Sequence, residues 1–213
     1  MPRWNASGTT CARLAALVLA VGCSRTALQA PRFDPVAAAR AAMAEFDANH
    51  DGALDAEEIA KCPSLLAAKA AIDKDGDGRL TEAELVARLK SYQGNQGAVK
   101  LFPCRVLLND QPLAGATVTL EPEKFIGPTF KPATGTTMQQ GDTVVSAEDV
   151  RAKGFSGVYC GLYRVRISAK NAAGKETVPA KYNTATTLGL ELPADAEPGK
   201  GFVFRLSSSS SRS

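Results

Sequence analysis

Two stretches of the chain, residues 47–58 and 73–84, repeat one order of side chains and constrain the fold more than any other feature. Each stretch begins with aspartate, has glycine at its sixth position and ends with glutamate. Glycine there, Gly52 or Gly78, permits a sharp reversal of the chain. Positions 1, 3, 5, 7, 9 and 12 are Asp47, Asn49, Asp51, Ala53, Asp55 and Glu58 in the first stretch, and Asp73, Asp75, Asp77, Arg79, Thr81 and Glu84 in the second.

This spacing suits a hard divalent cation, because calcium takes six to eight oxygen ligands at about 2.3–2.6 Å. Side chains at positions 1, 3 and 5 supply oxygens, position 7 supplies a backbone carbonyl, position 9 acts through water, and the final glutamate supplies two oxygens. Position 7 can therefore carry any side chain. Both stretches resemble the EF-hand loop at every position. The resemblance implies two bound Ca²⁺ ions, with the residues named above at the ligand positions.

The two loops are expected to form one pair. Leu54 and Leu80 stand at the eighth position of their loops and can join them through a short β-bridge. Pro63 breaks the chain between the loops, and Ser64 is predicted to cap the helix that follows. Helices are predicted over residues 36–46, from residue 56 onward, over 65–72 and over 82–92.

Other interpretations of the loops fit the sequence less well. An acidic surface turn that binds nothing fits a single loop better than two complete loops in tandem. Dockerin-type modules also pair calcium loops, but that family ends its loop in aspartate, whereas these end in Glu58 and Glu84. Calcium sensors expose a Met-rich groove, and Met43 is the only methionine among residues 36–93. We therefore expect constitutive, stabilising calcium.

The N-terminus has the features of an export signal. Basic residues precede an apolar run, Leu14 to Val21, that is too short to span a bilayer and has the size of a signal-peptide core. The segment Ala20-Val21-Gly22-Cys23 resembles the lipobox of bacterial lipoproteins. In that family the cysteine is lipidated and becomes the new N-terminus.

The lipobox resemblance implies a signal peptide over residues 1–22, a lipid anchor on Cys23 and a flexible tether over 23–35. It places the chain on the bacterial cell envelope, in the periplasm or on the outer membrane. An ordinary signal peptide cut near Gln29-Ala30 is the alternative.

The second half of the chain predicts β structure. Short alternating apolar runs, broken by Gly, Pro and Asn, occupy residues 99–108, 116–120, 162–167, 188–192 and 202–206. Acidic residues outnumber basic ones by 12 to 7 over residues 34–93, and basic residues outnumber acidic ones by 14 to 10 over residues 96–213, which favours two units. We expect an α+β multidomain chain, with an all-α EF-hand pair over 36–93, an antiparallel β-sandwich over 98–206 and a disordered serine-rich tail over 207–213.

Three segments of the β half carry a family resemblance. Residues 109–118 (NDQPLAGATV), 160–165 (CGLYRV) and 178–183 (VPAKYN) are similar to motifs of carboxypeptidase regulatory-like, transthyretin-like sandwiches. The resemblance implies that fold and says almost nothing about activity.

Three cysteines remain beyond the signal and the lipobox. Cys104 and Cys160 both lie in strand-like sequence, and an exported chain can hold a disulfide between them. Two buried thiols in adjacent strands are the alternative. Cys62 is expected to serve as a small apolar residue between two helices.

Catalysis is not expected. His50 is the one histidine of the chain and lies in a calcium loop, which leaves no Ser-His-Asp set, no zinc spacing and no candidate catalytic residue. Carboxylates outside the loops are expected to be solvated. Tyr159, Tyr163 and Tyr182 belong either to the core or to a sugar-binding patch.

The expected function is that of a calcium-binding, lipid-anchored, non-enzymatic binding or scaffold module. Its partners would be calcium, the membrane through the anchor, and an unknown envelope protein or glycan. The net charge of +3 gives no reason to expect nucleic acid. The alternative is a calcium-dependent adhesion or carbohydrate-binding protein with its ligand site on the β-sandwich.

Overall fold

The computed structural model describes residues 28, 30–93, 99–197, 199 and 201–208. The predicted signal peptide, the lipidation site at Cys23, tether residues 24–27 and 29, the hinge at residues 94–97 and the serine tail beyond Ser208 lie outside these residues. Within the described part of the chain, no helix combines the length and apolar character that crossing a bilayer requires.

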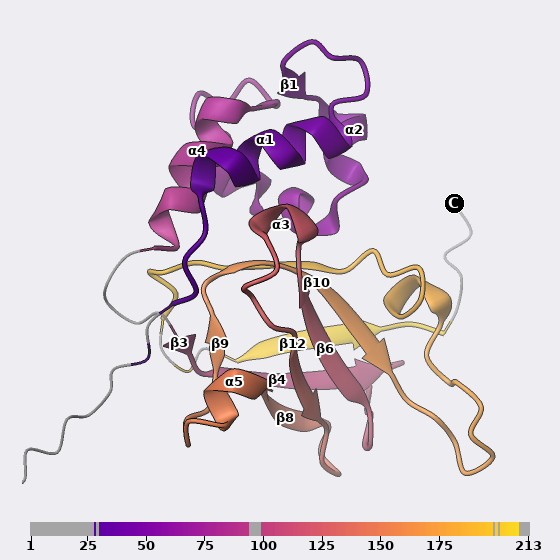
Figure 1. Ribbon diagram of the computed structural model, residues 1–213. Coiled ribbons are helices and arrows are strands. Elements are labelled where there is room, and N and C mark those ends of the chain that lie inside the picture. The colour runs from indigo at the N-terminus through magenta and orange to yellow at the C-terminus, as the bar shows by residue number, and fades with distance from the viewer. Residues whose placement is uncertain (1–27, 29, 94–98, 198, 200, 209–213) are drawn as a thin grey trace, which may run out of the picture.

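The N-terminal half is a helical unit built around the two loops (Figure 1). Asp34 begins the first helix by accepting hydrogen bonds from the amides of Val36 and Ala37. The second and fourth helices begin with capping boxes. In each, the side chain of the capping residue accepts from the amide of a glutamate three residues later, and that glutamate side chain accepts from the amide of the capping residue. The helices are α1 (Pro35–Phe46), α2 (Ala56–Ala60), α3 (Pro63–Ile72) and α4 (Glu82–Ser91).

One helix start differs from the prediction. α3 begins with Pro63 in its first turn and Cys62 at the capping position, so Ser64 lies inside the helix rather than capping it. Proline is favoured at this place because its missing amide would have no partner in the first turn. Ser64 is instead fully buried, 3.4 Å from the sulfur of Cys62.

The predicted bridge between the loops is confirmed. β1 (Ala53–Leu54) pairs antiparallel with β2 (Leu80–Thr81), and Leu54 lies opposite Leu80. Both leucines are fully buried.

The C-terminal half is a mostly antiparallel β region, so the chain is α+β as predicted. Its strands follow the order β11-β10-β6-β7-β8-β4-β12. They are β4 (Phe102–Leu108), β6 (Thr117–Pro122), β7 (Ala133–Thr136), β8 (Asp142–Ala147), β10 (Gly161–Ser168), β11 (Gly189–Leu192) and β12 (Phe202–Leu206). The shorter elements are β3 (Val99–Lys100), β5 (Gln111–Pro112), η1 (Lys124–Ile126), α5 (Glu148–Arg151), β9 (Val158–Tyr159) and η2 (Ala180–Tyr182).

One pairing departs from the antiparallel sheet expected. β12 runs parallel to β4, with Phe204 opposite Val106. The chain reaches β12 from β11, at the far edge of the strand order, so no hairpin fixes the direction of β12 against its neighbour.

Alternation along β10 confirms the predicted inward face. Tyr163, Val165 and Ile167 are buried, whereas Arg164 and Arg166 are partly exposed. Tyr159 is buried as well, so these two tyrosines belong to the core rather than to a sugar-binding patch.

The helical unit lies over the β region (Figure 1), where α3 packs against β11 and β10. Leu162 alternates away from the inward side chains of β10, yet it is only 1% exposed because the helical unit covers it. Phe46 at the end of α1 meets Phe125 of η1 edge to face, with ring centroids 6.4 Å apart. One apolar core therefore runs through both halves.

Two carboxylates expected to be solvated lie at this junction instead. Glu191 of β11 accepts hydrogen bonds from Arg88 of α4 and from Tyr92, which directly follows that helix. Glu123, which follows β6, is 5% exposed and lies 3.6 Å from the Arg164 guanidinium. Burial raises the pKa of Glu123, although Arg164 opposes the shift. The prediction that these carboxylates are solvated was wrong for both, because the helices cover a strand face that would otherwise be exposed to solvent.

The candidate disulfide between Cys104 and Cys160 is not formed; both side chains are buried as thiols. Cys104 lies on β4, whose neighbours are β8, β5 and β12, whereas Cys160 directly precedes β10, whose neighbours are β6 and β11. The strands are therefore not adjacent. Burial raises the pKa of the Cys104 thiol to about 12.

Candidate metal centre

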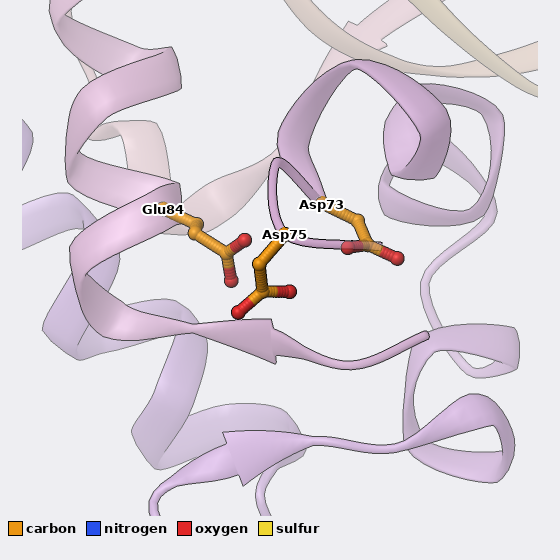
Figure 2. Close-up of side chains that lie close together, drawn as sticks. All are labelled: Asp73, Asp75 and Glu84. Atoms are coloured by element: carbon orange, nitrogen blue, oxygen red, sulfur yellow. The ribbon is translucent and has the colours of Figure 1, made fainter. Parts of the chain in front are cut away.

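The second loop brings three carboxylates together. Asp73 directly follows α3, Asp75 lies at the third loop position, and Glu84 stands in the first turn of α4. Figure 2 shows the three side chains facing one another, and one carboxylate oxygen from each lies within 4.8 Å of the others. Hard oxygen donors at this spacing fit calcium.

Backbone amides of the second loop hold these carboxylates in place. Asp73 accepts from Gly76 at 2.7 Å and from Gly78 at 3.0 Å, while Asp75 accepts from Asp77 at 3.1 Å. Both glycines have positive φ, 76° and 86°, so the loop can turn tightly around the site.

Glu84 closes the second loop. One of its oxygens accepts from the amide of Lys74 and the other from the amide of Thr81, each at 2.9 Å. Partial burial acts to raise the pKa of Glu84, but these amides outweigh it and hold the pKa below its usual value. The carboxylate is therefore anionic at neutral pH.

The first loop has most of the same internal hydrogen bonds. Glu58 accepts from the amides of Ala48 at 2.8 Å and Asp55 at 3.0 Å, and Asp47 accepts from Gly52 at 3.1 Å. The other oxygen of Asp47 is buried and has no hydrogen-bond partner. A buried carboxylate oxygen without a donor is costly unless it binds a cation, so the first loop also fits a metal ion.

The ninth-position side chains act as helix caps. Asp55 accepts from the amides of Glu57 and Glu58, and Thr81 accepts from the amide of Glu84. Loop closure and helix initiation thus depend on the same residues.

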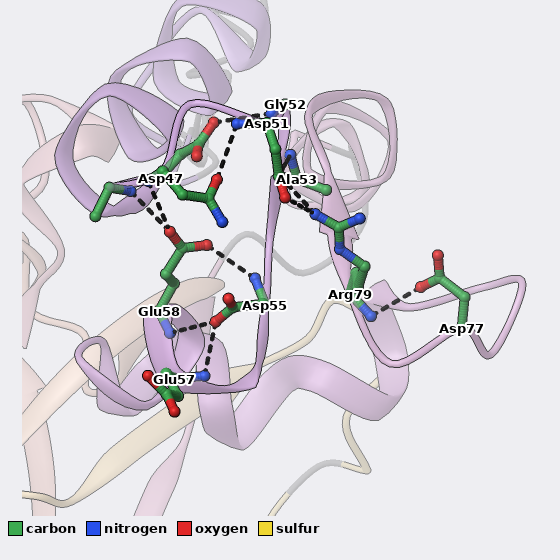
Figure 3. A network of polar contacts seen from close by, with 11 residues as sticks. Asp47, Asp51, Gly52, Ala53, Asp55, Glu57, Glu58, Asp77 and Arg79 are labelled. Atoms are coloured by element: carbon green, nitrogen blue, oxygen red, sulfur yellow. Dashed lines mark hydrogen bonds and ion pairs between the residues drawn. The ribbon is translucent and has the colours of Figure 1, made fainter.

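The two loops differ at the fifth position. Asp51 of the first loop is paired with the guanidinium of Arg79 from the second loop (Figure 3). The Ala53 amide and Arg79 together lower the pKa of Asp51. The loops also differ at the third position, where the first loop has the amide side chain of Asn49 and the second loop has the carboxylate of Asp75. Sequence reasoning treated the Arg79 side chain as free to vary and missed this contact.

An EF-hand family model matches residues 39–63 and 70–90. These EF-hand segments contain both loops and imply that the chain binds calcium. Comparison with curated proteins gives no match. Among solved structures, the crystal structure of a 9R-lipoxygenase from Cyanothece PCC8801 aligns with 70% of this chain at 12% identity and a TM-score of 0.27. The chain spans about a fifth of that protein, 21% of its length.

Proposed function

We propose that the protein holds one Ca²⁺ in each EF-hand loop as a permanent part of its fold. The observation that carries this is the convergence of Asp73, Asp75 and Glu84 within 4.8 Å. In the second loop the side chains of these residues and of Asp77 would hold the ion, together with the Arg79 carbonyl. In the first loop the corresponding groups are those of Asp47, Asn49, Asp51, Ala53 and Glu58.

The packing of the flanking helices supports a stabilising role over a switch. Switching EF-hands work by changing the angle between helices. Here the start of α3 rests on β11 through Pro63, and the end of α4 is tied to the same strand through Glu191. Calcium would join the opposite ends of these helices, at Asp73 and Glu84. A helix pair fixed at one end by the sheet and at the other by the ion has little freedom to open.

Titration calorimetry with calcium, supported by equilibrium dialysis, tests the proposal. We expect two ions per chain for the wild type and none for the Glu58→Gln/Glu84→Gln double variant. A wild-type chain that binds no calcium at millimolar concentration would refute it.

We further propose that the protein is lipid-anchored on the cell envelope. The segment Ala20-Val21-Gly22-Cys23 supports this. Expression in a bacterium with labelled fatty acid should label the wild-type chain but not the Cys23→Ala variant. An unlabelled mature chain that begins near Ala30 would instead show an ordinary signal peptide.

We also propose that the β region is a transthyretin-like sandwich that serves as a binding or scaffold module. Its support is the resemblance of residues 109–118, 160–165 and 178–183, together with the inward alternation of β10. The carbohydrate-binding alternative is weaker, since Tyr159 and Tyr163 are buried in the core. An experimental structure of the region tests the fold, and a different strand connectivity would contradict it.

A further inference from the structure

One side chain bridges the two loops. Arg79 occupies the seventh position of the second loop, where only its backbone carbonyl would face a metal ion. Its side chain crosses to the first loop, and Nη2 lies 2.5 Å from both carboxylate oxygens of Asp51 (Figure 3). Both side chains remain partly exposed, at 40% and 43%.

The backbone fixes both partners of this ion pair. The amide of Arg79 donates to Asp77 at 2.8 Å, and the amide of Ala53 donates to Asp51 at 3.1 Å. β2 begins directly after Arg79, and β1, which pairs with it, begins two residues after Asp51. The pair is therefore built into the geometry of the joined loops.

The seventh-position side chain of the first loop makes no matching contact with the second loop. Ala53 stands at the seventh position of the first loop, and its methyl group cannot reach the second loop. Asp77, which matches Asp51 in position, accepts from the Arg79 amide. In the first loop, the carboxylate of Asp51 is therefore paired with a cation from the other loop.

We propose that Arg79 makes the first loop the weaker calcium site, so that calcium fills the second loop before the first. This inference rests on the proposed calcium binding. A guanidinium on Asp51 competes with calcium for that carboxylate, and its charge repels the divalent ion. Because the pair is exposed, added salt weakens the effect.

Two glycine amides report the loops separately. Gly52 donates to Asp47 at 3.1 Å, and Gly78 donates to Asp73 at 3.0 Å. Each amide is bonded to the first ligand of its own loop. Calcium binding to that carboxylate changes the environment of the amide proton, so the nuclear magnetic resonance signal of each glycine follows its own site.

The test is a calcium titration of the ¹⁵N-labelled full chain, followed through Gly52 and Gly78. In the wild type we expect the Gly78 signal to respond at lower calcium than the Gly52 signal. In Arg79→Gln the calcium midpoint of Gly52 should fall about 3- to 10-fold, as removal of a unit charge beside a divalent ion in water predicts. The midpoint of Gly78 should move less. Arg79→Lys should keep most of the wild-type difference, because the positive charge remains.

Arg105→Gln is the matched control. It removes an exposed arginine–aspartate pair of the same kind, Arg105 with Asp142 at 2.7 Å, in the β region. Both glycine midpoints should stay at their wild-type values in this variant. Signals of the β region that keep their positions show that each variant is folded.

Several outcomes would overturn the inference. Equal wild-type midpoints, or a Gly52 midpoint that rises or stays constant in Arg79→Gln, would show that Arg79 does not weaken the first loop, while calcium binding would stand. If neither glycine responds to calcium in the wild type, the proposed function itself fails, and this inference fails with it.

Discussion

Gly189 of β11 lies so close to Pro63 of α3 that a Cβ at position 189 would stand 1.8 Å from the Pro63 carbonyl oxygen. The obstructing atoms belong to the backbone, so no side-chain rotation can relieve the contact. This glycine therefore sets how closely the helical unit approaches the sheet.

Gly189→Ala should force α3 away from β11. Overpacking of a tight contact costs about 1–3 kcal/mol and occasionally more, and we expect the upper end of that range in urea unfolding. Gly201→Ala is the control, since the nearest atom to its new Cβ is 3.9 Å away. Equal stability losses in the two variants would contradict the close packing of the halves.

Glu123 should make stability depend on pH in a specific direction. Its pKa is raised above the ordinary 4.5 by burial, against the opposing charge of Arg164. The stability contributed by the protonated form is fully present below the unfolded pKa and is lost as pH rises through the folded pKa. The unfolding free energy of the wild type should thus fall relative to Glu123→Gln above pH 4.5.

Urea unfolding of both chains in chelator, at several pH values from 4 to 7, measures this difference. Chelator removes the separate pH dependence of calcium binding. Parallel stability curves for the two chains would show that Glu123 ionises as freely in the fold as in the unfolded chain.

The three described cysteines should resist modification in the folded protein. Cys62, Cys104 and Cys160 are at most 4% exposed, and burial raises their pKa values, that of Cys62 to about 11. The reactive thiolate is therefore scarce at neutral pH. Alkylation with peptide mapping should label all three only after unfolding, without reductant. If Cys104 and Cys160 were labelled only after reductant is added, they would form a disulfide, and their assignment as thiols would be wrong.

Calcium binding at each EF-hand loop should be open to removal without loss of binding at the other loop. Glu84→Gln and Glu58→Gln each remove the charge of one two-oxygen ligand. We expect the calcium affinity of that loop to fall by more than about 100-fold, since even residues that only hydrogen-bond to metal ligands contribute 10- to 100-fold to metal affinity. Calorimetry should show one remaining ion per chain. Glu57→Gln is the control, because Glu57 is exposed at a non-ligand position. Loss of both ions in either single variant would mean that the loops do not bind independently.

The loops could be predicted because their ligand pattern is local, with every ligand position of a loop inside twelve residues. The capping boxes of Asp55 with Glu58 and of Thr81 with Glu84 are equally local but were not predicted. The one cap that was predicted, Ser64, lies inside α3. The strands around Val165 were visible for the same reason, since a period of two marks a half-buried strand.

The junction between the halves could not be predicted, because it depends on which surfaces meet. Nothing near Leu162 or Glu191 in sequence shows that helices cover their strand face. The pairing of Arg79 with Asp51, which are 28 residues apart in the sequence, likewise needs the two loops to lie side by side. A long basic side chain at position 7, facing a short one at the same place in the partner loop, was the available signal.

The melting temperature of the full chain in chelator and in saturating calcium tests the central claim most directly. Binding to the folded state alone adds about 2.7 kcal/mol per site at a hundredfold excess over Kd. For a chain of this size that corresponds to a rise of about 5–10 °C per site. We predict a rise of this order for the wild type and none for the Glu58→Gln/Glu84→Gln variant. Identical wild-type melting temperatures in chelator and in calcium would contradict the account.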